Sequence, residues 1–294
     1  METLRAIALM VVSMALLALS DTFLKLASGH ASAGQVMVML SVGGTALFVL
    51  VARARRVPLR VADFCHPKVL LRNLFEMIGA IGMVIGLSRI PLSLMAAIMQ
   101  TAPLVVTLGA ALFLREPVGW RRWSAVAVGL TGMLMVIRPF GAAFTGWEIF
   151  PVLGVTGLAA RDLVTRTLPP AMPSLAVSAY GFGAVLPAGL GVLAISGAPL
   201  SGEPIVFAHM ACAVVVTAAG YLAVTAAMRM APVSSVAPFR YTRLVFTAGL
   251  GIAVFGERPD GWTWAGAALI LAAGLYSFLR ERRLARQELA VVRP

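Results

Sequence analysis

The chain has 294 residues, of which 60% are hydrophobic and only 12% are charged, and its mean hydropathy is +0.92. A soluble domain could not carry so many apolar side chains on its surface, so this composition excludes a soluble protein and predicts a polytopic membrane protein. The net charge of +12 does not indicate nucleic-acid binding, because the basic residues lie at the ends of apolar runs and form neither a face nor a stripe.

Ten apolar runs follow one another along the chain, each near the ~20 residues that a helix needs to cross the hydrocarbon core. They cover residues 4–27, 34–52, 69–87, 93–114, 120–138, 146–166, 173–195, 204–228, 233–255 and 261–280. The loops between them are short and leave no room for a soluble catalytic or nucleotide-binding domain. The predicted fold is therefore all-α, with ten transmembrane helices.

Basic residues set the predicted orientation of these helices. Most of the 24 Lys and Arg residues flank run ends on the side of the N-terminus, among them Arg53, Arg55, Arg56, Lys68, Arg121 and Arg122. Because the positive-inside rule places such flanks in the cytoplasm, we expect both termini to be cytoplasmic.

An acid and a base lie one helical turn apart near the end of the first apolar run, in "LALSDTFLKLA". The same spacing recurs 141 residues later in "LAARDLVTRTL", so Asp21 and Lys25 correspond to Asp162 and Arg166. Ionisable groups inside hydrocarbon are costly, and their default interpretation is functional. The alternative is a structural ion pair within each helix.

The 141-residue offset extends well beyond this motif and indicates a duplication. It joins Gly79 to Gly220, Pro91 to Pro232, Ser93 to Ser234, Glu116 to Glu257 and Trp123 to Trp264. The predicted units are a first repeat at 1–141, a second at 142–282 and a basic tail at 283–294. Because each repeat holds an odd number of helices, the second is inverted in the membrane, and two inverted repeats can expose a central site to each side in turn.

Inversion places the two acid–base motifs at opposite ends of one pathway. Asp21 and Lys25 fall near the outer end of the first helix, whereas Asp162 and Arg166 fall near the inner end of the sixth. We therefore expect these four residues to act as alternating gates rather than as ligands for cargo.

The run at 69–87 carries a second acid and a set of small residues. Arg72 and Glu76 lie one turn apart, and Glu76 is about 10 Å inside the inner boundary at 1.5 Å per residue. Gly82 and Gly86 are typical of a helix face that packs closely against another helix.

The fourth and ninth runs each contain an internal proline, Pro103 and Pro238, which is typical of interrupted helices at binding sites. The alternative is a simple packing kink. Polar residues gather beside both prolines: Gln100, Tyr241, Arg240 and Arg243. Gln100 and Tyr241 are themselves 141 residues apart.

Depth along the helices predicts how these charges pair. Arg240 and Glu76 both lie about 10 Å from the inner face, so we expect them to pair, which leaves Arg243, about 15 Å deep, in excess. An unpaired guanidinium at that depth is best explained by water, a backbone carbonyl or a bound anion such as a substrate carboxylate. The alternatives are that Arg243 reaches the interface or pairs with another acid. Tyr221 and Asn73 are weaker candidates for the cavity wall.

Several motifs of other protein classes are missing from the sequence. It contains no Walker A sequence, no HExxH, no GxSxG, and no cluster of His or Cys at metal-ligand spacing. Cys65 and Cys212 fall in a loop and in a helix, so no disulfide is expected. We therefore predict a protein that is not an enzyme and has no metal or cofactor.

The sequence resembles the drug/metabolite transporter superfamily, specifically its EamA-type members. The resemblance covers almost the whole chain, and its most specific parts are the Glu-centred segments "QTAPLVVTLGAALFLREPVGW", with Glu116, and "FGERPDGWTWAGAALILAAGLYSFL", with Glu257. It implies a secondary carrier of the bacterial inner membrane with a cavity between the halves, mainly against the third, fourth, eighth and ninth helices. Such relatives export amino acids or take up S-adenosylmethionine or riboflavin, and the first repeat resembles the S-adenosylmethionine type somewhat more. Ser41 stands where those relatives often carry an arginine.

The main functional hypothesis is alternating-access transport of a small polar, carboxylate-bearing metabolite, such as an amino acid or S-adenosylmethionine. The expected partners are this cargo, the lipid bilayer, and a proton or sodium ion that Glu76 or Asp21 would bind, in a monomer or homodimer. The alternatives are a non-transporting scaffold or subunit, or a carrier for a vitamin or drug. The predicted binding residues are Arg243, Gln100, Tyr241, Arg240, Glu76, Tyr221 and Asn73.

Overall fold

The computed structural model describes residues 2–115, 119–139, 141, 144–169, 171–231 and 233–291, with side chains except at 229, 233, 234, 237 and 281–291. In these residues the regular structure is entirely helical. The first half holds α1 (Glu2–Ser28), α2 (Ala33–Ala54), α3 (Val61–Phe64), α4 (Pro67–Arg89), α5 (Leu92–Met99), α6 (Ala102–Phe113) and α7 (Trp120–Ile137). The second half holds α8 (Ile149–Thr165), α9 (Ser174–Ser196), α10 (Pro204–Met230), α11 (Val233–Val236), the 3₁₀ segment η1 (Ala237–Tyr241), α12 (Thr242–Phe255) and α13 (Gly261–Val291).

Seven of the described helical spans are long and apolar enough to cross a membrane. One of them, Leu92–Phe113, joins α5 and α6. The observed helices lie within a few residues of the predicted apolar runs, and α3 is a single additional turn in the loop before α4. The arrangement is compatible with the ten predicted spans.

The fourth and ninth runs are both interrupted beside their internal prolines, Pro103 and Pro238. In the first half, α5 ends at Met99 and α6 begins at Ala102, with Pro103 in its first turn. In the second half, Pro238 opens the 3₁₀ segment between α11 and α12. Proline has no N–H to donate, so a new first turn is where it is best tolerated. The prolines thus mark discontinuous helices.

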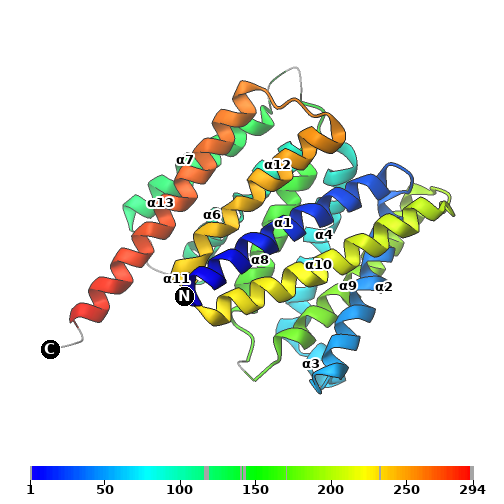
Figure 1. Cartoon of the computed structure of the whole chain (residues 1–294), viewed down its shortest axis with the longest axis horizontal. Helices are drawn as coiled ribbons and strands as arrows, with labels where there is room; N and C mark the ends of the chain where they lie inside the picture. The colour runs from blue at the N-terminus through cyan, green and yellow to red at the C-terminus, as the bar shows by residue number, and fades with distance from the viewer. Residues whose placement is uncertain are drawn as a thin grey trace.

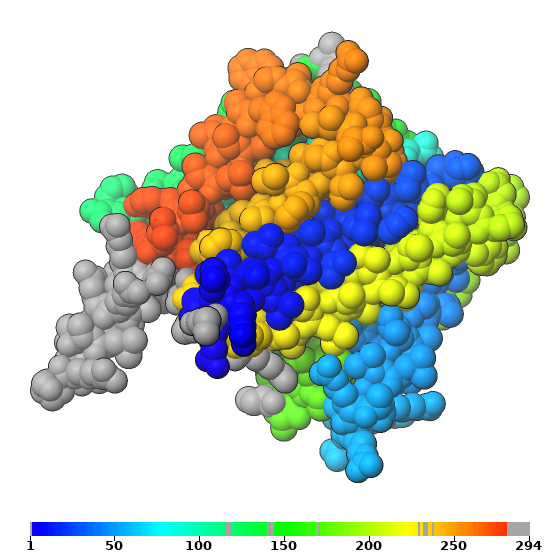
Figure 2. Space-filling model, viewed as in Figure 1, coloured from blue at the N-terminus to red at the C-terminus, as the bar shows by residue number. Residues whose placement is uncertain are grey.

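The principal helix contacts join the two halves. Figure 1 shows α1 lying between α10 and α12, and α7 beside α13. The closest-packed pairs are α4 with α8, α1 with α10, α2 with α9 and α7 with α13. In the space-filling view α1, in dark blue, likewise lies between α10 and α12 on one face (Figure 2). The repeats therefore share one core and do not form separate bundles.

Two hydrogen bonds place a pseudo-twofold axis between the halves. Ser41 donates its hydroxyl to the Phe182 carbonyl at 2.5 Å, and Gln100 donates its amide to the Tyr241 carbonyl at 3.1 Å. Each bond joins residues that are 141 apart. Because residues related by a twofold axis can touch only near that axis, these contacts locate it.

Small residues allow equivalent helices to cross closely. A Cβ on Gly82 would lie 2.3 Å from the backbone nitrogen of Gly154, so α4 and α8 meet at their backbones. A Cβ on Gly79 would meet Leu158 at 2.7 Å. Its equivalent on Gly220 would meet Leu17 at 2.9 Å, at the crossing of α1 and α10. The predicted close-packing face of α4 is confirmed, and the duplication repeats part of it.

Large apolar side chains remain exposed along the helices, including Val12, Leu50, Ile195, Val215 and Val245. The buried interior contains Met, Leu, Val and Ala, with Met37, Leu87 and Leu92 in its largest cluster. An exterior as apolar as the interior suits a protein surrounded by lipid, which explains the high mean hydropathy.

Candidate functional site

We keep the predicted orientation in naming the outer and inner ends. At the outer end, the Lys25 ammonium caps the end of α4. It donates to the carbonyl oxygen of Leu87 at 3.2 Å and to that of Ile90. A cation at a helix C-terminus satisfies carbonyls that the helix leaves free and interacts favourably with its dipole. Lys25 thus binds α4 rather than Asp21, its neighbour on α1.

Asp21 pairs with Arg243, whose guanidinium nitrogen lies 2.6 Å from the carboxylate. The expectation that Arg243 is in excess was therefore wrong. Helix α1 packs along α12, which brings the two residues together, and a long arginine side chain spans the depth between their backbones. The pair buries most of Asp21, whose side chain is 9% exposed.

A four-residue ion network joins α4 to α8. Glu76 accepts from Arg72 on its own helix at 2.5 Å and from Arg161 on α8 at 3.0 Å. Arg161 also binds Asp162 at 2.7 Å. We call Arg72, Glu76, Arg161 and Asp162 the ion network. Each member has an opposite charge within reach, as buried charges require.

The predicted pairing of Glu76 with Arg240 was wrong. Arg240 is exposed on η1, and Glu76 is occupied by Arg72 and Arg161. Depth counting gave both residues the same height, yet it does not set which way a side chain faces. The close packing of α4 on α8 decides the partner.

At the crossing of α1 and α10, the positions equivalent to Arg161 and Glu76 form an uncharged contact. The hydroxyls of Ser20 on α1 and Thr217 on α10 are hydrogen bonded to each other. The 141-residue offset relates Ser20 to Arg161 and Thr217 to Glu76. One contact of the duplicated fold is therefore neutral in one copy and ionic in the other.

Tyr221 faces the interior between these crossings. It lies one turn after Thr217, which contacts α1, and two turns after Val214, which packs against Gly43 of α2. Three guanidinium groups lie within electrostatic range of its phenol: those of Arg72, Arg161 and Arg243. The side chain is nevertheless 39% exposed. Part of its surface therefore stays uncovered although it lies near these buried groups.

Two aromatic rings support Tyr221. Its ring meets Phe48 of α2 edge-on at a centroid distance of 6.2 Å, and Phe48 stacks on Phe182 of α9 at 5.3 Å. We call Tyr221, Phe48 and Phe182 the aromatic cluster. A Cβ on Gly44 would lie 2.3 Å from the Phe182 ring, so only glycine leaves room for this ring beside α2.

The remaining predicted binding residues do not all join this region. The Asn73 side chain accepts from Arg72 at 3.1 Å and is buried beside the ion network. Gln100 donates to the Tyr241 carbonyl near the pseudo-twofold axis, and the Tyr241 ring packs on Gly274 of α13. Gln100 and Tyr241 therefore connect interrupted helices.

The inner motif differs from the outer one. Asp162 pairs with Arg161, and within the described residues the exposed Arg166 side chain has neither a hydrogen bond nor an ion pair. Neither repeat forms the ion pair between the acid and the base one turn later. The four predicted gating residues thus have different partners at the two ends.

Glu257 joins the loop after α12 to the start of α5 at the outer end. Its carboxylate accepts from the backbone N–H groups of Leu92 and Ser93 and from the Ser93 hydroxyl, the last two at 2.8 and 2.7 Å. A carboxylate there satisfies free donors at the start of α5. Its counterpart Glu116 lies outside the described residues.

The loop before α13 carries a further outer tie. Asp260 accepts from the backbone and hydroxyl of Thr263 and pairs with Arg138 of the first half. These donors, the Thr263 backbone first, lower the pKa of Asp260 to about 2.

Comparison with known proteins places this architecture in a family. Two consecutive copies of the family model match residues 4–138 and 145–279, which together span nearly the whole chain. The chain belongs to the EamA-like transporter family. The predicted resemblance is confirmed. The two matched segments are 141 residues apart, as are the residues that hydrogen bond at the pseudo-twofold axis.

This EamA-like transporter is similar to curated proteins with different cargoes. It is 31% identical to a riboflavin transporter of Rhizobium johnstonii over 74% of this chain and 72% of that protein. It is 26% identical to an S-adenosylmethionine uptake transporter of Rickettsia bellii over 73% of each chain. A pseudopaline exporter of Pseudomonas aeruginosa is 25% identical over 86% of this chain and 88% of the exporter.

A crystal structure shares the fold of this EamA-like transporter with a TM-score of 0.60. The match covers 94% of this chain and 98% of the other at 15% sequence identity. At that identity the likeness concerns the fold alone. The EamA-like transporter is thus a multi-pass membrane protein with a two-repeat fold.

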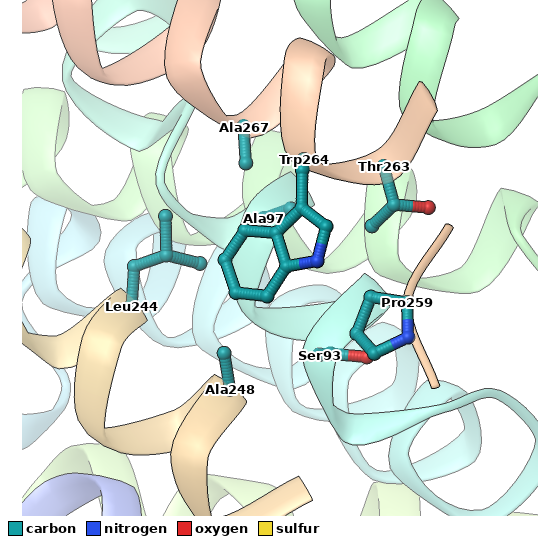
Figure 3. Close-up of a pocket in the computed structure, with 8 residues that line it drawn as sticks. All are labelled: Ser93, Ala97, Leu244, Ala248, Pro259, Thr263, Trp264 and Ala267. Carbon is teal, nitrogen blue, oxygen red and sulfur yellow. The ribbon is translucent and has the colours of Figure 1, made fainter. Parts of the chain in front are cut away.

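A small pocket in this EamA-like transporter lies beside Trp264 at the outer end (Figure 3). Its volume is about 10 Å³, and its wall includes Ser93, Ala97, Leu244 and Ala248. That volume is near the lower limit for one water molecule, so this pocket cannot hold a metabolite. Within the described residues no group of His, Cys, Asp and Glu is arranged to hold a metal ion.

Sequence reasoning missed Arg161 and Glu257 as contact-forming residues. Arg161 directly precedes Asp162 inside an apolar run, and that adjacency was a usable signal. Glu257 was recognised only as part of a specific segment, because its partners on α5 are remote in sequence. These partners could be found only by knowing which helices pack together, and no local sequence pattern gives that information.

Proposed function

We propose that the chain is a secondary active transporter that moves a small metabolite across the bacterial inner membrane by alternating access. The observation that carries this proposal is a difference between equivalent residues at the two ends. Lys25 caps the end of α4, whereas Arg166, its counterpart 141 residues later, is exposed. The outer end thus has a contact between Lys25 and α4, and the inner end lacks the equivalent contact of Arg166.

The duplication identifies the contact that would close the inner end. Leu87 and Ile90, whose carbonyls bind Lys25, correspond to Met228 and Ala231 at the end of α10. We propose that Arg166 caps these carbonyls in the opposite state, when Lys25 has released α4. Simultaneous capping at both ends would seal the pathway, so the two caps alternate.

Burial differs between the ends in the same sense. Leu24 is 3% exposed, whereas its equivalent Thr165 is exposed. The side chain of Asp21 is 9% exposed and that of Asp162 is 46% exposed. These differences support a state that is closed outside and open inside, in the predicted orientation.

The proposed cargo is a metabolite of the kind that the relatives carry. Riboflavin and S-adenosylmethionine, named for two sets of relatives, share a planar nitrogen heteroaromatic ring attached to a hydroxylated chain or sugar. The expectation of a carboxylate depended on an unpaired Arg243, and its pairing with Asp21 removes that basis. Because the sequence contains no Walker A motif, an ion gradient is the proposed energy source.

Cysteine labelling tests the alternation directly. Cys65 and Cys212 are replaced by serine, and a reporter cysteine is placed at Leu24 or Thr165 in intact spheroplasts and in inverted vesicles. Lys25→Met should raise labelling at position 24 from outside, and Arg166→Met should raise labelling at position 165 from inside. The matched substitutions remove one cap each and must act in opposite directions.

The same variants are assayed for transport in proteoliposomes. Both should slow uptake of radiolabelled riboflavin or S-adenosylmethionine, because each disfavours one of the two required states. Unchanged labelling by either substitution, or shifts in the same direction, would contradict the alternating caps. Failure of the parent protein to transport any metabolite offered would favour a non-transporting role.

A further inference from the structure

We propose that the cargo carries no net charge and that its planar heteroaromatic ring lies on Tyr221. This inference rests on the proposed transport function and names the class of molecule that the interior accepts. Three observations support it: the place of Tyr221, the rigidity of its support, and the balance of charge around it.

Tyr221 offers a partly free aromatic surface inside the bundle. It shares a face of α10 with Val214 and Thr217, which contact α2 and α1, so it does not face lipid. In this interior position it is 39% exposed, whereas Phe48 beside it is only 4% exposed. Polar ligands with an aromatic ring bind best where such a surface adjoins a few polar groups.

The aromatic cluster holds the Tyr221 ring in one orientation. Phe48 meets it at an interplanar angle of 83° and is itself stacked on Phe182 at 22°. The three rings come from α10, α2 and α9, which are fixed to one another by close packing. A platform that is already ordered loses little conformational entropy when a ring stacks on it.

The charges around Tyr221 are fully matched. The three guanidinium groups near it, on Arg72, Arg161 and Arg243, face three carboxylates, on Glu76, Asp162 and Asp21. An anionic cargo would have to displace one of these carboxylates from its arginine, and a cationic cargo would have to displace an arginine. An unbalanced charge at membrane depth is costly, so this arrangement favours an uncharged cargo.

Ligand pairs that differ only in charge test the inference. The purified full-length protein is titrated with riboflavin and FMN, which share one ring, and with adenosine and AMP, which share another, by fluorescence or calorimetry. S-adenosylmethionine serves as the cationic member. We expect riboflavin or adenosine to bind at least about tenfold more tightly than its phosphorylated partner and than S-adenosylmethionine.

Two tyrosine positions separate stacking from folding. Tyr221→Ala should weaken binding of the uncharged ligand about tenfold, as expected when a stacking surface is lost, and Tyr221→Phe should retain most of it. Tyr180→Ala is the matched control, because Tyr180 bonds the Arg60 carbonyl and meets Phe64 at the inner end. Its binding should equal that of the parent, and thermal unfolding of each variant verifies the fold.

Each other outcome has a distinct meaning. Equal or tighter binding of FMN, AMP or S-adenosylmethionine would overturn the inference, as would no binding of either uncharged probe. So would unchanged binding after Tyr221→Ala. If the protein then transported a charged metabolite in proteoliposomes, the proposed transport function would stand without this inference. If no metabolite offered were transported, the transport function itself would fail.

Discussion

Two helix crossings of this protein are copies of each other and yet differ in chemistry. Where α1 crosses α10, Ser20 and Thr217 share a hydrogen bond between hydroxyls. Where α4 crosses α8, the equivalent positions hold Arg161 and Glu76, with Arg72 and Asp162 completing the ion network. Both crossings keep the same glycine–leucine contact, Gly220 with Leu17 and Gly79 with Leu158.

The difference shows that the duplication conserved geometry and not polarity. A glycine facing a leucine sets how closely two helices approach, which both copies need. Buried charge, by contrast, destabilises unless it is matched, and a hydroxyl pair at the same place avoids that cost. We therefore expect the charged crossing to matter more for transport than the neutral one.

The largest expected effect comes from removing the central carboxylate of the ion network. Glu76→Gln leaves Arg72 and Arg161 without their shared counterion, which should cost about 3–5 kcal/mol of unfolding free energy and abolish transport. Thr217→Val at the equivalent position removes only a hydroxyl hydrogen bond, worth about 0.6–1 kcal/mol. Denaturant unfolding in detergent and transport in proteoliposomes measure both.

A paired substitution tests whether the charged crossing can be made like the neutral one. Glu76→Thr with Arg161→Ser removes one charge of each sign and should recover only part of the stability lost by Glu76→Gln, because Arg72 and Asp162 then lose their partners. Transport should stay absent. A double variant that still transports at the parental rate would show that the ion network is only structural.

Two glycines at these crossings should also differ in their tolerance of a methyl group. Gly82→Ala places Cβ against the backbone of Gly154, which cannot move aside, and should cost about 1–3 kcal/mol. Gly220→Ala meets the end of the flexible Leu17 side chain and should cost less than about 1 kcal/mol. Thermal unfolding of the two variants compares them, and equal losses would show that the two glycines are equally constrained.

The smallest effect concerns a tie that only the outer end possesses. Asp260 pairs with Arg138, whereas the equivalent positions hold Gly119 and Leu279. Because folding lowers the pKa of Asp260 from 3.8 to about 2, its stabilising contribution is complete above pH 3.8 and is lost as the pH falls through 2. Asp260→Asn should lower Tm slightly at neutral pH and make little difference well below pH 2. A difference that persists in acid would contradict this role.

Hydropathy and periodic recurrence in the sequence predicted most of the fold. The apolar runs match the helices, the prolines mark the interrupted ones, and the 141-residue offset anticipates the axis contacts. These features are local or repeat at a fixed spacing, so they can be read without knowing which helices touch. Gly82 was predicted in the same way, because spacing alone identifies a close-packing face.

The ionic partners could not be predicted in this way. Arg243 and Asp21 are 222 residues apart, and only the packing of α12 on α1 brings them together. Counting residues gives depth in the membrane but not the direction of a side chain, and the error with Glu76 and Arg240 followed from that. Tyr221 was identified as polar within a helix, but its position near three arginines depends on four helices, α4, α8, α10 and α12.

The contacts of Ser41 with Phe182 and of Gln100 with Tyr241 differ from the other ties between the halves that the structure describes, because each joins residues 141 apart. A motion that makes each half take the other's conformation leaves points on its rotation axis in place, so residues there keep the same neighbour throughout. The caps and ion pairs farther out must exchange partners. These two hydrogen bonds can therefore persist in both states of such a motion. The two ends would then open in turn while the halves stay in contact at the axis.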